Sequence, residues 1–345
     1  MSKSIFSNKN ILITGGTGSF GSSFVDYLLK IKNNKPKKII VFSRDELKQY
    51  NMAKLYPKSK YPNIRFFIGD VRDKSRLKLA FKNVDYVIHS AALKHVPTAE
   101  YNPIEYIKTN IIGAQNIIEA SLECNVKNIV ALSTDKASSP INLYGATKLC
   151  SDKLFISANN ITGKKNKIFS IVRYGNVMGS RGSVIPVFKE QAKKGVIKIT
   201  DLKMTRFNIT IEESIKLVLL ALEKSIGGEI FVPKIPSYKI LDLAHAVSSK
   251  KTKIKIIGIR PGEKIHEELI SLSEANNTLD LKKYYVVLSP LLTKSNNDLS
   301  KVLYKKYLNF KNSAKVSGDF QYNSGSNEKF LSVAQLKKLL QKSAI

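Results

Sequence analysis

The stretch Asn10-Ile-Leu-Ile-Thr-Gly-Gly-Thr-Gly-Ser-Phe-Gly21 decides the fold of this chain of 345 residues. It opens with a largely apolar run typical of a buried β-strand, and glycines follow at positions 15, 18 and 21. The first glycine permits a tight turn, the second lets backbone amides approach a pyrophosphate, and the third allows a helix to pack closely on the strand. We therefore predict a strand, a phosphate-binding turn and a helix, which together form a dinucleotide site.

Short apolar runs alternate with amphipathic stretches through the first half of the chain, an order typical of βαβ units. We expect an α/β protein with a Rossmann-like, doubly wound parallel sheet that has helices on both faces. The expected strands are residues 10–14, 38–43, 65–69, 84–90, 128–133 and 167–174, and the expected helices are residues 21–30, 75–82, 101–125 and 144–158.

After residue 175 the segments become shorter and turn residues become more frequent. We predict that residues 1–174 form the nucleotide-binding domain and carry the catalytic residues. Residues 175–290 are expected to form mainly a smaller substrate-binding lobe, with some segments that return to the sheet. Residues 291–345 are rich in Ser, Asn and Lys, and we expect a C-terminal tail or cap that ends in a helix.

The composition limits the class of partner. The chain has 57 Lys and Arg residues against 27 Asp and Glu, a formal net charge of +30. These basic residues are spread along the chain without interleaved aromatic platforms, so we expect no nucleic-acid partner and favour a compositional bias, although a basic background also suits polyanionic small molecules. The two cysteines lack the spacing of a zinc site, so we expect no metal and a reducing cytoplasm. We expect no signal peptide and no membrane span.

The end of the second expected strand selects the cofactor. An acidic residue there accepts a hydrogen bond from the free ribose hydroxyl of NAD, whereas this chain has Ser43-Arg-Asp-Glu-Leu-Lys48. Arg44 can stack on adenine and bind a 2′-phosphate, with help from Ser43 and Lys48, so we predict NADP. A shift of one turn would bring Asp45 to the ribose, which keeps NAD as the alternative.

A carboxylate also follows the third expected strand, in the pair Asp70-Val71. In that position it can hold the adenine amino group. A helix cap for residues 75–82 is an almost equally good interpretation, because Asp is a favoured capping residue.

A Tyr-x-x-x-Lys motif, Tyr144-Gly-Ala-Thr-Lys148, stands at the start of an expected helix. The spacing of four places both side chains on one helical face. A nearby ammonium group favours the phenolate, so we expect Lys148 to lower the pKa of Tyr144 and to hold the nicotinamide ribose. The residues expected to bind the cofactor are Gly15, Thr17, Gly18, Ser19, Phe20, Gly21, Ser43, Arg44, Asp45, Glu46, Leu47, Lys48, Asp70, Val71, Ser90, Lys94, Tyr144 and Lys148.

In the order and spacing of these motifs, residues 8–290 resemble the extended short-chain dehydrogenase/reductase family. That resemblance implies hydride transfer at a sugar hydroxyl, with Thr134 as the best match for the hydroxyl residue beside the Tyr-Lys pair. The next residues, Asp135-Lys136, stand where sugar 4,6-dehydratases place an acid–base pair. Retaining enzymes of that kind typically have Asp-Glu there, and this chain instead resembles the inverting UDP-N-acetylglucosamine 4,6-dehydratases.

Further stretches carry the same resemblance: Ala92–Pro97, Pro140–Lys153, Tyr174–Ser183, Met204–Phe207 and Gly258–Glu267. It implies an NADP-dependent lyase that removes water from UDP-N-acetylglucosamine with inversion at C5, as the first step toward pseudaminic acid for surface structures such as flagellin. It also implies a homo-oligomer, for which the helix at residues 101–125 is a candidate interface. The residues expected to act in catalysis are Thr134, Asp135, Lys136, Tyr144 and Lys148.

The resemblance assigns each of these side chains a task. Tyr144 removes the O4 proton while hydride leaves C4. Lys136, held neutral, then removes the C5 proton, and Asp135, held protonated, donates to the departing C6 hydroxyl. Both protonation states require shifted pKa values, which a closed site with interacting groups can provide.

Arginine forks and polar side chains in the same motifs suit a nucleotide diphosphate and its sugar. The set expected to bind substrate is Lys94, Asn176, Arg181, Thr205, Arg206, Arg260 and Glu263.

Three other functions remain open from the sequence. A retaining 4,6-dehydratase and a UDP-sugar 4-epimerase share this fold, and Asp135-Lys136 argues against both because epimerisation needs no pair for elimination. A non-catalytic NADP-binding scaffold is the third, and it has no need to keep Tyr144, Lys148 and Lys136.

Overall fold

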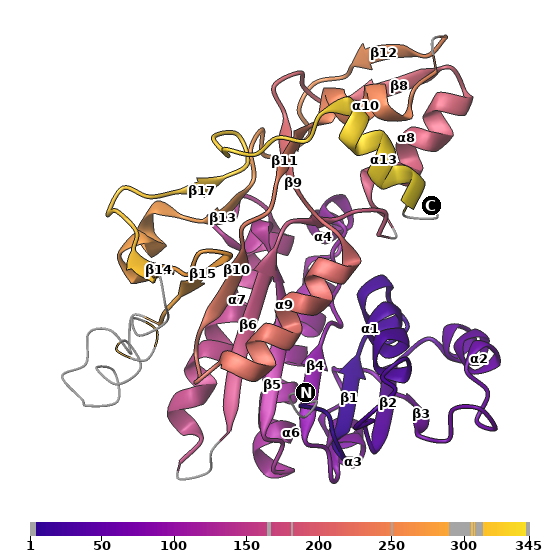
Figure 1. Cartoon of the computed structure of the whole chain (residues 1–345), viewed down its shortest axis with the longest axis vertical. Helices are drawn as coiled ribbons and strands as arrows, with labels where there is room; N and C mark the ends of the chain where they lie inside the picture. Colours follow the sequence, from indigo (N-terminus) through magenta and orange to yellow (C-terminus); the bar gives the residue numbers. More distant parts are fainter. Residues whose placement is uncertain are drawn as a thin grey trace.

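The computed structural model describes residues 5–163, 167–180, 182–249, 251–289, 305, 307 and 313–342. At its centre the apolar runs of the first half form parallel strands that pair in the order β3-β2-β1-β4-β5-β6 (Figure 1). Most side chains of the five strands other than the edge strand β3 are buried, because helices cover the sheet on both sides. The bounds are β1 Asn10–Thr14, β2 Lys38–Ser43, β3 Ile64–Ile68, β4 Tyr86–His89, β5 Asn128–Thr134 and β6 Ile168–Tyr174.

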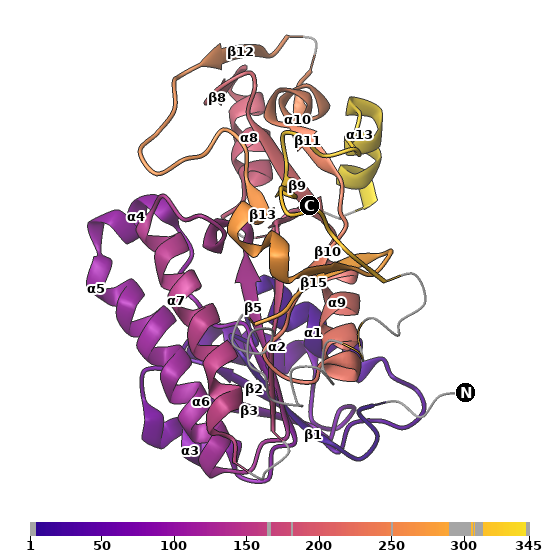
Figure 2. The same cartoon turned by 90° about the vertical axis from the view of Figure 1, so that its left-hand side faces the viewer.

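Figure 2 shows helices on both faces of this sheet. The helices α3 and α6 pack on each other and α6 packs on α7 on one face, while α1 and α9 pack together on the other. The predicted doubly wound α/β fold is therefore confirmed. The bounds are α1 Ser19–Leu29, α2 Glu46–Leu55, α3 Lys74–Phe81, α6 Gly113–Glu123, α7 Leu143–Ala158 and α9 Ile211–Lys224.

The single helix expected at residues 101–125 is wrong in detail. The segment consists of α4 (Val96–Tyr101), α5 (Pro103–Tyr106), a π-helical turn (Ile107–Ile112) and then α6. The π turn buries Asn110, whose amide group bonds the backbone of Leu93 and the hydroxyl of Thr147. Such widened turns occur where a helix must place a polar group, and here that group connects a loop to the helix of the Tyr-Lys motif.

Later segments return to the sheet and extend it. Strand β10 (Ile230–Pro233) is parallel to β6, and β15 (Tyr284–Val287) pairs antiparallel with β10. Strands β14 (Thr278–Asp280) and β16 (Ala314–Lys315) complete the far edge. The large sheet therefore includes residues far beyond position 174.

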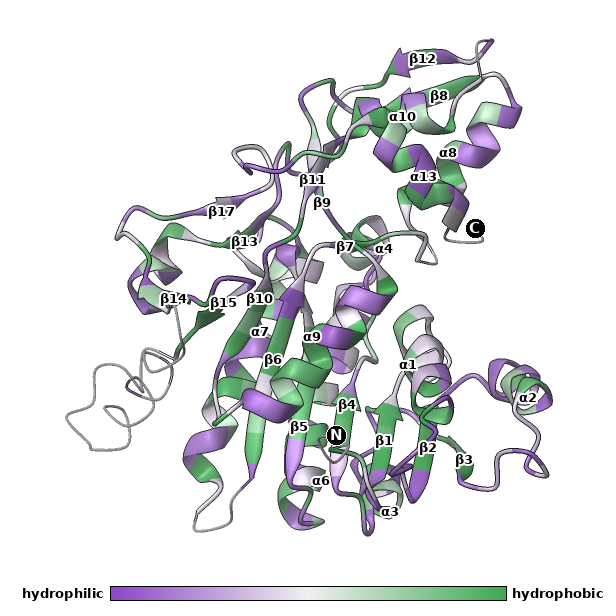
Figure 3. Cartoon of the chain, viewed as in Figure 1, coloured by the Kyte–Doolittle hydropathy of each residue, from purple (hydrophilic) through white to green (hydrophobic). Residues whose placement is uncertain are grey.

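The remaining residues form a smaller lobe with its own apolar core, which includes Leu243, Leu336 and Leu340. Figure 3 shows hydrophobic residues concentrated in the central strands of the large sheet and a second group in this lobe. No helix of the described residues is both long and apolar enough to cross a membrane. The elements of the lobe are α8 Val184–Lys193, β8 Val196–Ile199, α10 Ile240–Val247, β12 Lys253–Ile256 and α13 Val333–Lys342.

A three-stranded sheet lies between the two parts, with the order β11-β9-β7 (Figure 1). Its strands are β7 Asn176–Val177, β9 Thr205–Ile209 and β11 Ser237–Lys239. The C-terminal segment crosses the same region, because β17 (Tyr322–Asn323) pairs with β13 (Glu268–Ile270). Residues 291–304, 306, 308–312 and 343–345 of the expected tail lie outside the described residues.

The glycine turn makes a prediction about stability. A Cβ atom at Gly21 would lie 2.4 Å from the carbonyl oxygen of Gly15, so Gly21→Ala must force the helix away from the turn. We expect a loss of about 1–3 kcal/mol, the usual cost of overpacking, measured by urea unfolding. Gly318→Ala is the control, since its Cβ would meet only Asn276, at 3.5 Å. Equal unfolding free energies for Gly21→Ala and Gly318→Ala would contradict the close packing of Gly21 on Gly15.

Candidate active site

The turn between β1 and α1 has the form that a phosphate group needs. Gly15 has a φ of 64°, a left-handed conformation that favours glycine. Helix α1 begins after Gly18 without a side-chain cap. Its first amides and its positive dipole end therefore suit a phosphate, and the close approach of Gly21 to Gly15 leaves no room for a larger residue beneath it. The chain's own geometry thus fits a dinucleotide.

In the segment after β2, the basic residue Arg44 and the acidic residue Asp45 have different partners. Asp45 caps α2: its carboxylate accepts from the backbone amide of Lys48 at 2.9 Å and pairs with the Lys48 ammonium group at 2.5 Å. Ser43 is buried, and its hydroxyl accepts from Gln49. The Arg44 side chain is 55% exposed, and its nearest acidic partner, Asp70, is 3.8 Å away. Arg44 is therefore available to an anionic ligand, while the Asp45 carboxylate is held by its own helix.

Asp70 does not cap the next helix, so that alternative interpretation is wrong. Asp73 caps α3 through the amide of Arg76, whereas Asp70 pairs with Arg72 at 2.8 Å. Hydrogen bonds and charge from Arg72 outweigh the effect of burial and lower the pKa of Asp70. Val71, next in sequence, is buried beside Gly113.

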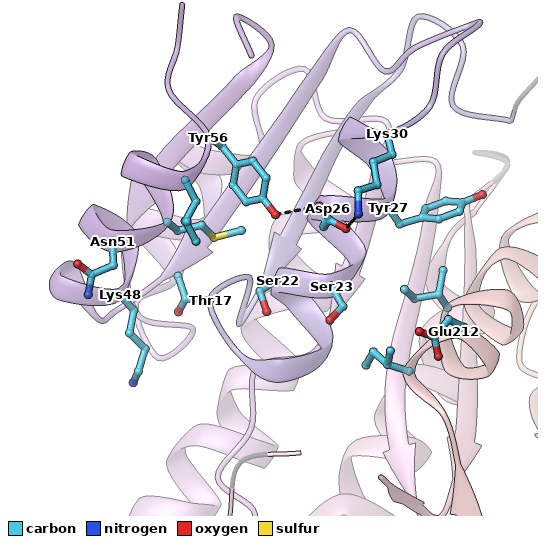
Figure 4. Close-up of a pocket in the computed structure, with 14 residues that line it drawn as sticks. Thr17, Ser22, Ser23, Asp26, Tyr27, Lys30, Lys48, Asn51, Tyr56 and Glu212 are labelled. Carbon is cyan, nitrogen blue, oxygen red and sulfur yellow. Dashed lines mark hydrogen bonds and ion pairs between the residues drawn. The ribbon is translucent and has the colours of Figure 1, made fainter. Parts of the chain in front are cut away.

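A cavity of about 810 Å³ lies on the outer side of the glycine turn, between α1, α2 and α9 (Figure 4). Thr17 and Lys48 are the predicted cofactor residues in its wall. Across it the Tyr56 hydroxyl donates to Asp26 at 3.1 Å. Its lining contains none of the predicted catalytic residues, so this cavity is separate from the reacting centre described next.

The Tyr-Lys motif lies at the start of α7, as the spacing predicted. Asn142 caps this helix by accepting from the amide of Gly145 at 2.8 Å. Tyr144 and Lys148 are 8% and 4% exposed. The Lys148 ammonium group donates to the carbonyl of Leu132 at 2.8 Å, and the hydroxyl of Thr134, at the end of β5, bonds Tyr144. Strand β5 and helix α7 thus bring together three of the expected catalytic residues.

The expected lowering of the Tyr144 pKa is not found in the polypeptide alone. Burial raises the pKa of Tyr144 to about 12, and the nearby charge of Lys136 only partly opposes that rise. Lys148 is itself deeply buried, which lowers its pKa. The sequence pattern predicted the positions of Tyr144 and Lys148 correctly. It does not indicate how completely the fold excludes water from these two side chains.

Asp135 and Lys136 follow Thr134 in a short 3-10 turn that ends at Ala137. Asp135 is fully buried, and the Lys136 Nζ lies 3.1 Å from its Oδ1. Lys136 Nζ is also 3.1 Å from Oε1 of Glu267, which stands just before β13. Arg206 Nε approaches the same Glu267 oxygen at 3.6 Å. The reacting centre is therefore a buried group of two carboxylates around one lysine.

The electrostatics agree with one expected protonation state and disagree with the other. Burial raises the pKa of Asp135, which favours the protonated acid that the expected role requires. Burial acts to lower the pKa of Lys136, but the Asp135 and Glu267 carboxylates outweigh it and raise that pKa above its ordinary value. In the polypeptide alone the neighbouring carboxylates favour the charged form of Lys136, which is opposite to the neutral form that its expected role requires.

Sequence reasoning missed the buried residues that support the centre. Arg173 is 1% exposed and lies 3.4 Å from Asp152 and 2.9 Å from Glu274. Because both carboxylates lie far from Arg173 in the sequence, no local pattern around Arg173 indicates these contacts. Asp152 also accepts from the hydroxyl of Ser133 at 2.7 Å. Only the position of Asp152, four residues after Lys148 on the same helical face, was available as a signal.

The expected substrate residues divide into two groups. Thr205 and Arg206 are buried on β9, where Thr205 bonds the His266 ring at 2.8 Å and Arg206 faces Glu267. Arg260 and Glu263 pair with each other on a loop, and the carbonyl of Gly262 in that loop accepts from Asn142.

The other members are more scattered. Asn176 bonds Tyr238, and Arg181 lies outside the described residues. Ser90, which was expected to bind the cofactor, donates to the carbonyl of Thr14. Lys94 stands near the centre, where desolvation and the charge of Lys136 lower its pKa. The free cysteines 124 and 150 are not paired, and no group of three potential metal ligands occurs in the described parts of the chain.

Comparison with known proteins extends these observations. Residues 11–289 match a family model described as polysaccharide biosynthesis protein. A Campylobacter jejuni protein named UDP-N-acetylglucosamine 4,6-dehydratase (inverting) is 52% identical over 97% of this chain and 98% of its own length. A Rickettsia bellii protein named UDP-glucose 4-epimerase is 42% identical over 97% of this chain and 96% of its own.

Solved structures show the same fold. The structure of Pen from Bacillus thuringiensis has a TM-score of 0.86 at 38% identity and covers 99% of both chains. The dTDP-glucose 4,6-dehydratase DesIV from Streptomyces venezuelae has a TM-score of 0.66 at 24% identity, over 74% of this chain and 86% of that one. The second likeness supports the fold alone.

The buried arginine gives a test of the support beneath the site. Arg173→Met would leave Asp152 and Glu274 without their cation, so we expect a loss of about 3–5 kcal/mol in unfolding free energy, as for other broken buried pairs. Lys194→Met removes an exposed partner of Glu190 and serves as the control. We expect the control to unfold like the unmodified chain. A stable Arg173→Met protein would contradict a supporting role for this group.

Proposed function

The chain belongs to the family of polysaccharide biosynthesis proteins, and we propose that it acts there as an NADP-dependent hydro-lyase on UDP-N-acetylglucosamine. The product is the 4-keto-6-deoxy sugar with inverted configuration at C5. One observation carries the proposal: Asp135 and Lys136 lie at the end of β5 beside Tyr144, in a chain that shares 52% identity with a protein named for this reaction.

The residues divide the chemistry among them. The glycine turn after β1 would hold NADP, which when bound would supply the hydride acceptor for C4 and the hydride donor for C6. Tyr144 acts as a phenolate, whose own proton leaves to solvent before the sugar binds, and it then takes the O4 proton. The high pKa of Tyr144 makes this phenolate a strong base. The 4-ketone that results acidifies the C5 proton, which leaves toward Lys136. Asp135 donates its proton to the C6 hydroxyl, which departs as water.

Inversion at C5 requires a proton to arrive on the face opposite to the one that was lost. Tyr144 carries the O4 proton at that stage and approaches from α7, whereas Lys136 approaches from the turn after β5, so we assign the return of the proton to Tyr144. Because the O4 proton then ends on C5, Tyr144 completes its cycle without help from solvent.

The expected cofactor preference rests on the segment after β2. Arg44 is half exposed, while Asp45 is engaged by its helix and by Lys48. A half-exposed arginine whose contact with Asp70 is a long 3.8 Å suits a 2′-phosphate, and an engaged carboxylate is poorly placed to bind a free ribose hydroxyl. These contacts support NADP over NAD.

The wider setting is proposed from the resemblance. We infer a cytoplasmic homo-oligomer that supplies the first intermediate of pseudaminic acid, a sugar for surface structures such as flagellin. The free cysteines of the described chain agree with a reducing compartment.

A 4-epimerase is the second candidate, because a relative at 42% identity has that name. An epimerase needs hydride transfer at C4 but no acid for a departing hydroxyl. The buried Asp135, whose raised pKa keeps a proton available, therefore favours dehydration.

Incubation with UDP-N-acetylglucosamine and NADP separates the two candidates. We expect a product lighter by one water in mass spectrometry and an inverted C5 in its proton NMR spectrum. Lys136→Met is expected to stop water loss, because the C5 proton then has no acceptor. A wild-type product of unchanged mass would instead identify an epimerase, and a lighter product with retained C5 would exclude inversion.

Cofactor choice has its own test. Arg44→Ala is expected to weaken NADP binding about 10- to 100-fold, the effect of losing a charge-assisted hydrogen bond, with little change for NAD. Lys58→Ala, an exposed change in the loop after α2, is the control and is expected to bind both cofactors normally. Isothermal titration measures each affinity. Tighter binding of NAD than NADP by the unmodified protein would overturn this assignment.

A further inference from the structure

Glu267 reaches the reacting centre from a segment remote in sequence from Lys136. It follows the loop that contains Arg260 and Glu263 and stands directly before β13, which packs on the turn Asp135–Ala137. The C-terminal segment fixes its backbone: the amide of Glu267 donates to the Ser324 hydroxyl at 2.9 Å, and its carbonyl accepts from the Ser324 amide at 2.8 Å. The position of this carboxylate is therefore set by three separate parts of the fold.

The Glu267 side chain is almost fully buried, at 2% exposure. Its Oε1 atom lies 3.1 Å from Lys136 Nζ, while its Oε2 atom is buried and has no hydrogen-bond partner among the described residues. A buried carboxylate oxygen without a partner is costly. In the resting site burial acts to raise the pKa of Glu267, but the charges of Lys136 and Arg206 outweigh it and lower that pKa, so a proton that Glu267 accepts is readily returned. The side chain is thus a proton acceptor at hydrogen-bond distance from the lysine.

Proton removal from C5 poses a difficulty that Lys136 cannot resolve alone. The lysine is protonated in the resting site, and an ammonium group has no lone pair with which to accept a proton. Solvent is a poor exit for the extra proton, because the Lys136 side chain is only 20% exposed. The second carboxylate beside it provides an internal exit.

On the basis of the proposed function, we propose that Glu267 is a catalytic partner of Lys136 that accepts the lysine proton before Lys136 takes the proton from C5. Lys136 follows Asp135 directly, and Glu267 supplies a second carboxylate at the side of the lysine from across the fold.

The protons balance over one cycle. A proton moves from Lys136 Nζ to Glu267 Oε1 and leaves a neutral amine and a neutral acid. The C5–H bond then breaks, its proton binds Nζ, and its electron pair forms the enolate that expels the C6 hydroxyl with the Asp135 proton. Lys136, which is 3.1 Å from both carboxylates, next passes one proton to Asp135 and recovers one from Glu267. All three groups return to their starting states.

Other charged groups also face the Lys136–Glu267 pair, and the variants must be compared in their presence. Arg206 approaches Glu267 from β9, and Lys264 acts on it from the preceding loop. The groups that face Lys136 are Asp135, Arg206, Tyr144, Tyr238 and Lys94. Dividing the wild-type rate of water loss by the variant rate at each pH removes the effects of these other charged groups, which both proteins share.

Glu267→Gln keeps the size of the side chain but cannot accept the proton. We expect it to form reduced cofactor from UDP-N-acetylglucosamine, which reports C4 oxidation, while water loss falls at least about 100-fold, the usual contribution of an acid–base group. The ratio of wild-type to variant rates should fall by about tenfold for each unit of rising pH, because Lys136 must then lose its proton to solvent. Absorbance and mass spectrometry follow the two steps separately.

Glu268→Gln is the matched control, since Glu268 is a buried neighbour that accepts from the Ser139 hydroxyl at 2.7 Å and does not pair with Lys136. The Glu268→Gln protein should keep the wild-type pH dependence of water loss even if the rate itself changes. Should Glu267→Gln fail to fold, Glu267→Asp and Glu267→Asn give the same comparison between an ionisable and a non-ionisable side chain.

Two results would overturn the inference. Water loss by Glu267→Gln at the wild-type rate and with the wild-type pH response would show that no second carboxylate is needed. An equal fall in C4 oxidation and water loss would show that Glu267 only supports the structure. If the unmodified protein releases no water from UDP-N-acetylglucosamine, the proposed function fails instead, so the two failures are distinguishable.

Discussion

The contact of Lys136 with two buried carboxylates is the interaction on which the reacting centre depends. Asp135 has no exposed surface and Glu267 almost none, so neither anion is stable there without a nearby cation or a proton. The lysine satisfies one negative charge, and burial raises the pKa of Asp135 and favours its neutral form. The proposed dehydration needs an acid and a proton carrier side by side, and the raised pKa of Asp135 beside Lys136 suits both roles.

This constraint explains the arrangement of the chain around it. The turn Asp135–Ala137 ends the central strand β5, Glu267 precedes β13, and Arg206 lies on β9 between the two lobes. The C-terminal strand β17 pairs with β13 and fixes Glu267 through Ser324. Behind the site, Arg173 joins β6 to α7 and to the segment at Glu274. The lobe and the last part of the chain thus complete the active site as well as covering it.

Local patterns in the sequence predicted much of this structure. The bounds of β1 and β2, the glycine turn and the placement of Tyr144 with Lys148 follow from short-range sterics and helical periodicity, which a sequence displays directly. The π turn at Ile107–Ile112 was missed because its cause is a contact between Asn110 and Leu93 in space. Glu267 and Arg173 were missed for the same reason, and the pKa of Tyr144 was misjudged because burial is a property of the assembled fold.

The central claim is that Asp135 holds a proton beside a charged Lys136 at neutral pH. Infrared difference spectroscopy between the unmodified protein and Asp135→Asn tests it directly, because a protonated carboxylic acid has a carbonyl stretch that a carboxylate lacks. The other buried carboxylates, including Asp152, are common to both proteins and cancel in the difference. A protonated-acid band that disappears in Asp135→Asn is the predicted result. Loss of a carboxylate band instead would show that Asp135 is ionised, and would contradict its role as the acid that releases water.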